Sequence, residues 1–235
     1  MYAPAGGMSR AGEPDPSLRW SIQTPPSGEA VPDWLEEIRA FRGRVLHDRG
    51  RRPGFQTPSG RFHDPDPADL QSFHVMAETE GRIVGCVRLG MLDQLSLGVC
   101  ERLLGSAGLA DALSRAGLRR SSAAECGGWS VAPEHRRTSV AFTLTAYACA
   151  LAQHLGVSAV FSAAGTRDGQ ARALARIAGY RWLPEMGDIP VPHFDDEVRI
   201  GLADPSQDGS TRLRELSRQL LVRHVRPLLG REAVR

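Results

Sequence analysis

The sequence predicts an α/β protein with an α+β mixed sheet, in which a twisted central sheet carries helices on both faces. Apolar and polar residues alternate along residues 73–79 and 82–91, and Glu80-Gly81 between them is typical of a hairpin turn. Residues 122–163 follow the pattern strand, amphipathic helix, buried strand, which favours a right-handed parallel crossover. Because an antiparallel hairpin and a parallel unit share one chain, we expect the sheet to be mixed.

The N-terminal part begins with residues 1–16, whose Gly, Pro and Ala content predicts disorder. A first strand is expected at residues 18–23. Asp33 is expected to cap an amphipathic helix over residues 34–47. Residues 50–69 form a long loop rich in Arg, Pro, Gly and Asp, and a loop of this length inside a compact domain is usually functional.

Helices and strands alternate through the rest of the chain. Glycines interrupt residues 93–117, which therefore predict one or two helices. The later expected elements are a strand at 122–131, a helix at 138–155 stopped by Gly156, a strand at 157–163, a helix at 168–178 ending at Gly179, strands at 180–183 and 197–202, and an amphipathic helix at 211–229.

Composition excludes several classes of protein. The 235 residues fit one domain from residue 17 to 235 after the disordered segment, and 41% hydrophobic residues suffice for a core. No apolar run reaches the length of a membrane span, and the start resembles no signal peptide, so we expect a cytoplasmic protein. A net charge of +2 does not indicate nucleic-acid binding. The four cysteines form no CxxC pair and the histidines show no ligand spacing, so we expect reduced thiols and no metal.

The most informative segment is Gly127–Ala141, where a strand ends at Val131 and two arginines precede a helix. The first turn of a helix offers unpaired N–H groups and partial positive charge, and Arg136 and Arg137 add full charges with a phosphate-matching geometry. The segment therefore predicts a cradle for a pyrophosphate or a phosphopantetheine. The alternative is an ordinary solvated helix start.

This segment resembles the signature of the GNAT acyltransferase superfamily, V-x-P-x-x-[RQ]-x-x-G-x-[GA] followed by a helix. Here the signature runs from Val131 to Ala141, with Ser139 in the place of its central glycine. Many members also carry a tyrosine general acid four residues before a Gly-aromatic pair. That pair is Gly179-Tyr180 and Ala175 takes the tyrosine position, so the ordinary acetyltransferase mechanism is not supported. The resemblance implies the GNAT fold.

Residues 35–200 are similar to the GNAT branch of the acyl-homoserine-lactone autoinducer synthases and the long-chain N-acyl amino acid synthases. The residues that carry this similarity are Arg42 within Phe41–Val45, Asp64 and Asp66 before a strand, Arg88 at the end of the hairpin, and Glu125 six residues before Val131. The autoinducer synthases have an arginine where Gly128 stands and usually an aromatic residue where Leu46 stands, so the N-acyl amino acid synthases match better. Pro192–Asp195 also resembles that side. The resemblance implies an acceptor half (17–117), an acyl-donor half (118–203) and a C-terminal helix (209–230).

The implied reaction is N-acyl transfer from an acyl-carrier protein or acyl-CoA to a small-molecule amine by direct attack on the thioester. The donor would lie along a set of residues that share one strand end and helix start: Trp129, Ser130, Val131, Arg136, Arg137, Thr138, Ser139, Val140 and Ala141. An acidic carrier protein would suit the arginines at positions 49, 51, 52, 136 and 137. Gly127-Gly128 would let the donor approach the strand backbone.

Five residues are candidates for the chemistry, each with a structural alternative. Glu125 is the candidate base, or else a carboxylate paired with an arginine for structure. Asp64 and Asp66 could bind the acceptor's ammonium, or simply form turns. Arg88 could clamp a carboxylate or neutralise Glu125 or Asp64. His74 could accept a proton, although a lone histidine beside apolar residues is more often structural.

Other functions remain open from the sequence. They are an autoinducer synthase that closes a lactone, an acyltransferase acting on a peptide or polyamine side chain, and a GNAT domain that binds an acyl donor without turnover. Cys126 has no neighbouring histidine in sequence to activate it, which disfavours a cysteine nucleophile.

Overall fold

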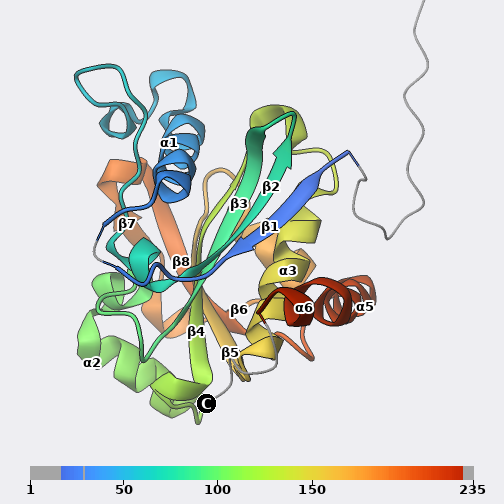
Figure 1. Ribbon diagram of the computed structural model, residues 1–235. Coiled ribbons are helices and arrows are strands. Elements are labelled where there is room, and N and C mark those ends of the chain that lie inside the picture. Colours follow the sequence, from blue (N-terminus) through green and yellow to red (C-terminus); the bar gives the residue numbers. More distant parts are fainter. Residues whose placement is uncertain (1–16, 29, 230–235) are drawn as a thin grey trace, which may run out of the picture.

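The computed structural model describes residues 17–28 and 30–229, so the expected disorder of residues 1–16 lies outside the described residues. One twisted sheet crosses the molecule in the strand order β1-β2-β3-β4-β5-β8-β6, with β7 paired to β8 (Figure 1). The strands are β1 (Arg19–Gln23), β2 (Phe73–Thr79), β3 (Arg82–Met91), β4 (Ala123–Val131), β5 (Ala159–Gly165), β6 (Arg181–Trp182), β7 (Ile189–Val191) and β8 (Asp196–Ala203).

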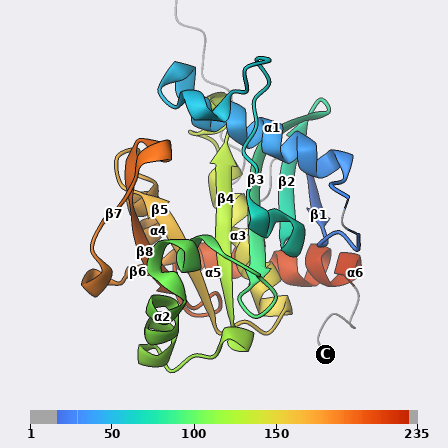
Figure 2. The same cartoon turned by 90° about the vertical axis from the view of Figure 1, so that its left-hand side faces the viewer.

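Helices cover both faces of the sheet. They are α1 (Asp33–His47), α2 (Val99–Arg115), α3 (Val140–His154), α4 (Gln170–Ala178), α5 (Thr211–Leu220) and α6 (Arg226–Leu229), the last two joined by a π-helical turn (Leu221–Val225). α1 and α2 lie on one face, and α3, α5 and α6 on the other (Figures 1 and 2). Apolar residues of α4 join the same core cluster as those of α3. The predicted mixed sheet with helices on both faces is therefore confirmed.

The hairpin has the predicted bounds because its turn geometry suits its residues. Glu80 and Gly81 both have positive φ angles, 49° and 71°, as a tight two-residue turn between twisted strands requires. β4 and β5 are parallel, as the crossover pattern predicts, and every other strand pair in the described residues is antiparallel.

Some boundaries differ from expectation. Asp33 is the first residue of α1 rather than its cap, because Pro32 takes the extended conformation before the helix. α2 begins only at Val99, and Gly105 breaks its helical backbone with φ 72° and ψ 162°. β7 was not expected, because a three-residue strand containing Pro190 carries no alternating pattern. The C-terminal helix runs as predicted but contains the π-helical turn.

The sheet splits between β4 and β5. The two strands pair only where Ala123–Glu125 meets Ala159–Phe161. Beyond that point β4 contains a bulge, at which its register with β3 shifts and Gly128 takes a φ of 59°. The edge of β4 that faces β5 therefore has no strand partner after Glu125 in the part of the chain that the structure describes. The split therefore leaves backbone N–H and C=O groups of β4 without a neighbouring strand in the middle of the sheet.

None of the helices in the described residues is long and apolar enough to cross a membrane.

Candidate functional site

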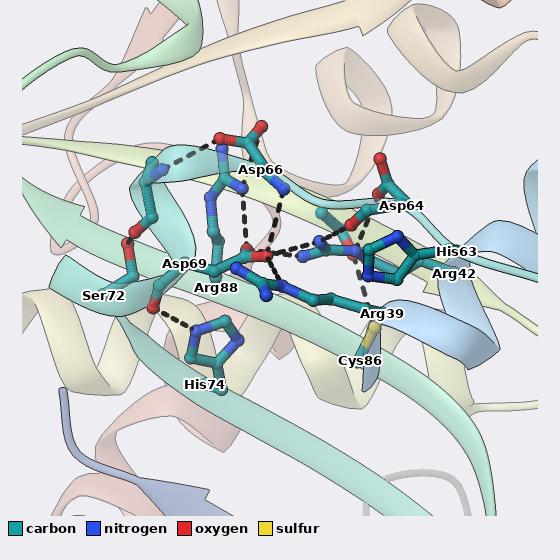
Figure 3. A network of polar contacts seen from close by, with 12 residues as sticks. Arg39, Arg42, His63, Asp64, Asp66, Asp69, Ser72, His74, Cys86 and Arg88 are labelled. Carbon is teal, nitrogen blue, oxygen red and sulfur yellow. Dashed lines mark hydrogen bonds and ion pairs between the residues drawn. The ribbon is translucent and has the colours of Figure 1, made fainter. Parts of the chain in front are cut away.

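A buried ion pair lies at the centre of the α1 face of the sheet. Arg42 of α1 donates from Nη1 and Nη2 to the two carboxylate oxygens of Asp69, at 2.7 Å each (Figure 3). The side chains are 1% and 0% exposed. Asp69 lies in the short 3₁₀ helix Pro67–Gln71, which Asp66 caps by accepting a hydrogen bond from the Ala68 amide. This turn directs the carboxylate inward against the sheet.

Further arginines complete the network around Asp69. Arg88 of β3 contacts Asp69 and Asp66, each at 3.0 Å from Nη1, and its Nη2 lies 3.6 Å from Glu125. Arg39 donates to Asp69 at 3.1 Å, and Arg102 of α2 pairs with Asp66 at 2.9 Å. The network therefore balances four guanidiniums (Arg39, Arg42, Arg88, Arg102) against four carboxylates (Asp64, Asp66, Asp69, Glu125). Such pairing offsets the cost of burying these charges.

The carboxylates titrate differently because their environments differ. Burial opposes the charge of Asp69, but the Arg42 hydrogen bonds and the positive charge of Arg88 hold its pKa well below the usual range. Burial also opposes the charge of Asp66, and Arg88 and Arg102 likewise lower its pKa. Burial raises the pKa of Asp64 despite the Arg42 guanidinium 2.8 Å away. Asp64 is also 17% exposed, so it is the network carboxylate best placed to exchange a proton with a ligand.

His74 lies behind this network rather than at its rim. Its side chain is buried on β2, and Nε2 is 2.8 Å from the main-chain oxygen of Asp69 (Figure 3). Because a carbonyl oxygen only accepts, Nε2 carries the proton and donates it. Burial lowers the pKa of His74 to about 4, so the ring is neutral at pH 7. This placement supports the turn that carries Asp69.

Glu125 occupies the start of the split and caps a helix. Its two carboxylate oxygens accept hydrogen bonds from the Val99 amide at 2.8 Å and the Cys100 amide at 2.7 Å, at the N-terminus of α2. Its side chain is 1% exposed, and Arg88 is its nearest cation at 3.6 Å. The structural alternative considered from the sequence, pairing with an arginine, is therefore present together with a capping role.

The glycines after Glu125 make room for arginines. A Cβ atom at Gly127 would lie 3.0 Å from Nη2 of Arg88, and one at Gly128 would lie 3.0 Å from Nη1 of Arg42. These glycines therefore leave room for guanidinium groups on this face, and the expected close approach of the donor to the strand stays a prediction.

An apolar cavity lies on the opposite face of the sheet, at the split. It has a volume of about 20 Å³, and residues of β4, α3, α4 and β5 line it, among them Cys126, Trp129, Cys149, Val160, Leu174 and Tyr180. Burial raises the pKa of Cys126 to about 12, so this thiol stays protonated and is a poor nucleophile. Side chains must move before a pantetheine arm or acyl chain fits, because the cavity holds about one water molecule.

The predicted anion cradle lies at the open end of β4. Arg136, Arg137 and Thr138 are exposed, and Val140 begins α3. The Thr138 hydroxyl caps the Val140 amide at 3.3 Å, whereas the Ser139 side chain makes no capping bond. Arg136 donates from Nε to the Val131 carbonyl at 3.4 Å, and neither Arg136 nor Arg137 has a carboxylate partner among the described residues, so their charges are available to an anion. Ser130 and Val131 are buried, and Ala141 lies in the first turn of α3.

Two of the arginines expected at a carrier-protein surface pair with a carboxylate of this chain, Arg51 at the surface and Arg52 with its own side chain buried. Arg51 and Arg52 both pair with Asp168, at 2.7 and 2.9 Å, and Arg52 also donates to the Phe194 carbonyl. Phe55 stacks on Phe194 at 5.4 Å between ring centroids. The loop after α1 therefore reaches across to the β5–α4 and β7–β8 connections. Of the five arginines expected there, Arg136 and Arg137 have no carboxylate partner within residues 17–28 and 30–229, and the side chain of Arg49 is outside the described ones.

Sequence reasoning missed the most central acid, Asp69, together with Arg39, which pairs with it, and Arg102, which pairs with Asp66. The signal was present, since Asp66 and Asp69 are three residues apart after a proline and so predict a capped turn. Arg39 and Arg42 are likewise three apart on one helix face. In the described residues, no group of three or more His, Cys, Asp or Glu side chains is arranged to hold a metal ion.

Known structures share this architecture. The acyl-homoserine lactone synthase BjaI, described as CoA-dependent and bound to SAM and isopentyl-CoA, has 15% identity, covers 87% of this chain and 90% of its own, and gives a TM-score of 0.60. TofI, bound to an inhibitor and MTA, has 15% identity, coverage of 84% and 99%, and a TM-score of 0.58. An acyl-CoA N-acyltransferase from Pseudomonas aeruginosa has 13% identity, coverage of 80% and 99%, and a TM-score of 0.52. At these identities the likeness shows the fold.

No curated protein matches the sequence. The model of the acetyltransferase (GNAT) family matches residues 33–180, more than half of the chain and the whole stretch from α1 through β4 and β5 to α4. The chain therefore belongs to the acetyltransferase (GNAT) family and is an acyltransferase of the GNAT type.

Proposed function

We propose that the protein transfers a long-chain acyl group from a pantetheine thioester to the amine of an amino acid or a related acceptor. The observation that carries this proposal is the split between β4 and β5. It lies between an apolar cavity on the α3 face and a buried ion network on the α1 face. A thioester held in the split would be open to attack by an amine that reaches it from the network side.

Three features of the structure support the proposed donor site. Arg136 and Arg137 stand beside the start of α3, where a phosphate would be stabilised. The free edge of β4 offers backbone groups to the pantetheine amides. The apolar cavity beyond would widen to take the start of an acyl chain. BjaI is described as CoA-dependent, which favours acyl-CoA, whereas acyl-carrier protein would deliver the same phosphopantetheine.

The acceptor site is supported by the rim of the ion network. Asp64 and Asp66 are 17% and 14% exposed, the most accessible carboxylates of the network. An ammonium bound there would be held by charge and would pass a proton to a carboxylate before the amine attacks. Glu125, with its oxygens held by two amides, would then act through a water or orient Arg88 toward a carboxylate of the acceptor.

Position 128 favours amide formation over lactone formation. The autoinducer synthases, which also close a lactone, have an arginine at this position. Here Gly128 has a positive φ, and any side chain would meet the Arg42 guanidinium at 3.0 Å. An arginine at 128 would therefore strain the backbone and crowd the Arg42 guanidinium.

The test is product formation by the purified protein. Acyl-CoA and acyl-carrier protein of several chain lengths are incubated with a panel of amino acids, S-adenosylmethionine and polyamines, and products are identified by mass spectrometry. We expect N-acyl amino acids, with free thiol released in equal amount. A lactone product, acylation of polyamines alone, or donor binding without any amide would each contradict the proposal.

A further inference from the structure

A buried hydrogen-bond donor without a partner lies at the split. Nε1 of Trp129 is buried and has no hydrogen-bond partner among the described residues. Leaving a buried N–H unpaired is unfavourable, because the group loses its bonds to water and gains none in return. Because Trp129 also lines the apolar cavity, this unpaired group points to a ligand that completes it.

We infer that the indole N–H of Trp129 donates a hydrogen bond to a carbonyl oxygen of the acyl donor's pantetheine–thioester arm. This inference rests on the proposed function, since it concerns the same donor. This side-chain role is separate from the pairing of pantetheine amides with the backbone at the free edge of β4.

The bulge in β4 directs the indole to this place. Gly127 and Gly128 both face arginines of the α1 face, so the extra residue of the bulge turns Trp129 toward the α3 face. There it lines the cavity beside Cys126 and Tyr180. Without the bulge, strict alternation would place positions 127 and 129 on one face.

Besides Trp129, the one other strong hydrogen-bond donor among the residues that line the cavity is the Tyr180 hydroxyl. The Thr145 hydroxyl donates to the main-chain oxygen of Ala141 at 2.9 Å, and burial keeps Cys126 and Cys149 as thiols, which are weak donors. Most of the other lining residues are aliphatic, such as Val87, Val160 and Leu174. Of the two strong donors that line the cavity, the Trp129 indole is the one buried without a partner, so it is the one we expect to select a carbonyl-bearing arm over a bare hydrocarbon chain.

The experiment compares Trp129→Phe with the wild type. Phenylalanine keeps an aromatic ring and removes only the N–H and part of the ring volume. We expect the Kd for acyl-CoA, measured by calorimetry, to rise five- to tenfold. Trp182→Phe, a change to a partly buried tryptophan on β6, should leave the Kd unchanged. An unchanged Kd in Trp129→Phe would overturn the inference.

A second measurement follows ligand binding in the wild-type protein itself. The chain has four tryptophans, so the ¹⁵N-labelled wild type gives four indole resonances, assigned by single Trp→Phe changes. Acyl-CoA should move the Trp129 indole proton downfield and slow its exchange with solvent. A Trp129 resonance that stays in place while acyl-CoA binds would overturn the inference and leave the proposed function intact. Failure of the wild type to bind either acyl-CoA or acyl-carrier protein would overturn both.

Discussion

Arg42 and Asp69, which are 27 residues apart, form a two-bond ion pair that is almost wholly removed from solvent. This pair joins α1 to the turn before β2, and Arg88 extends it to the hairpin and to Glu125. The acceptor side of the protein is therefore built on charge pairs in its interior. Burial of this kind makes each partner dependent on the other.

Removing one partner of this pair should be costly. We expect Asp69→Asn to lower the free energy of unfolding by about 3–5 kcal/mol, because it leaves buried guanidinium groups without a full countercharge. Asp111→Asn, which breaks the exposed pair with Arg115, is the matched control and should change stability little. Urea unfolding followed by circular dichroism measures both. Equal small effects would mean that the network is not needed for stability.

The buried His74 should make stability depend on pH. Its pKa is about 4 in the folded protein and 6.5 as the ordinary value, so the unfolded chain binds the proton more readily. Its contribution is present above pH 6.5 and is lost as the pH falls toward 4. Between pH 7 and 5 the wild type should lose about 2 kcal/mol more than His74→Gln, which cannot titrate. An equal loss in the free energy of unfolding for the two proteins between pH 7 and 5 would contradict this assignment.

Glu125→Gln tests the base and the cap together. Glutamine keeps the size of the side chain but can accept from only one of the Val99 and Cys100 amides, so we expect a loss of about 1–3 kcal/mol in stability. Turnover should fall more than tenfold at temperatures where the variant is folded. Near-normal turnover there would remove the catalytic role of Glu125 and leave the capping role.

Arg136 and Arg137, which precede α3 and have no carboxylate partner among the described residues, should govern the affinity for the acyl donor. Arg136→Ala combined with Arg137→Ala should raise the Kd for acyl-CoA about tenfold or more, through the loss of charge-assisted bonds to phosphate. The loss should shrink at high salt. Arg218→Ala with Arg223→Ala removes the same charge from exposed positions on the C-terminal helical segment and serves as the control. An equal effect of both double variants would reject the phosphate site.

The order of the loop after α1 should depend on the contacts that Arg52 makes with Asp168 and Phe194. Arg52 is 7% exposed and joins Asp168 and the Phe194 carbonyl. We expect Arg52→Ala to speed hydrogen exchange in residues 51–63 and around Phe194, while β2 and β3 keep wild-type protection. Unchanged exchange in that loop would show that the stacking of Phe55 on Phe194 suffices to hold it.

The sequence alone determined the features that depend on local pattern. The alternation around Glu80-Gly81 predicted the hairpin, and the strand–helix–strand spacing predicted the one parallel pair, because side-chain period and turn chemistry are local properties. The segment from Val131 to Ala141 likewise predicted the family. Arg88, Asp66 and Glu125 were named together from the sequence, and the structure places them in one ion network.

Only the tertiary structure decided which charges pair. Asp69 was missed, and Arg51 and Arg52 were expected at a free surface, because the carboxylate that pairs with both, Asp168, lies 117 and 116 residues away along the chain. For the same reason, the sequence could not predict that Glu125 caps the start of α2. It also could not predict that arginines lie beside Gly127 and Gly128. The spacing of apolar residues can be read directly from the sequence, and it predicts strands and helices. A buried ion pair, in contrast, depends on how separate elements pack against one another, and no local pattern of residues encodes that packing.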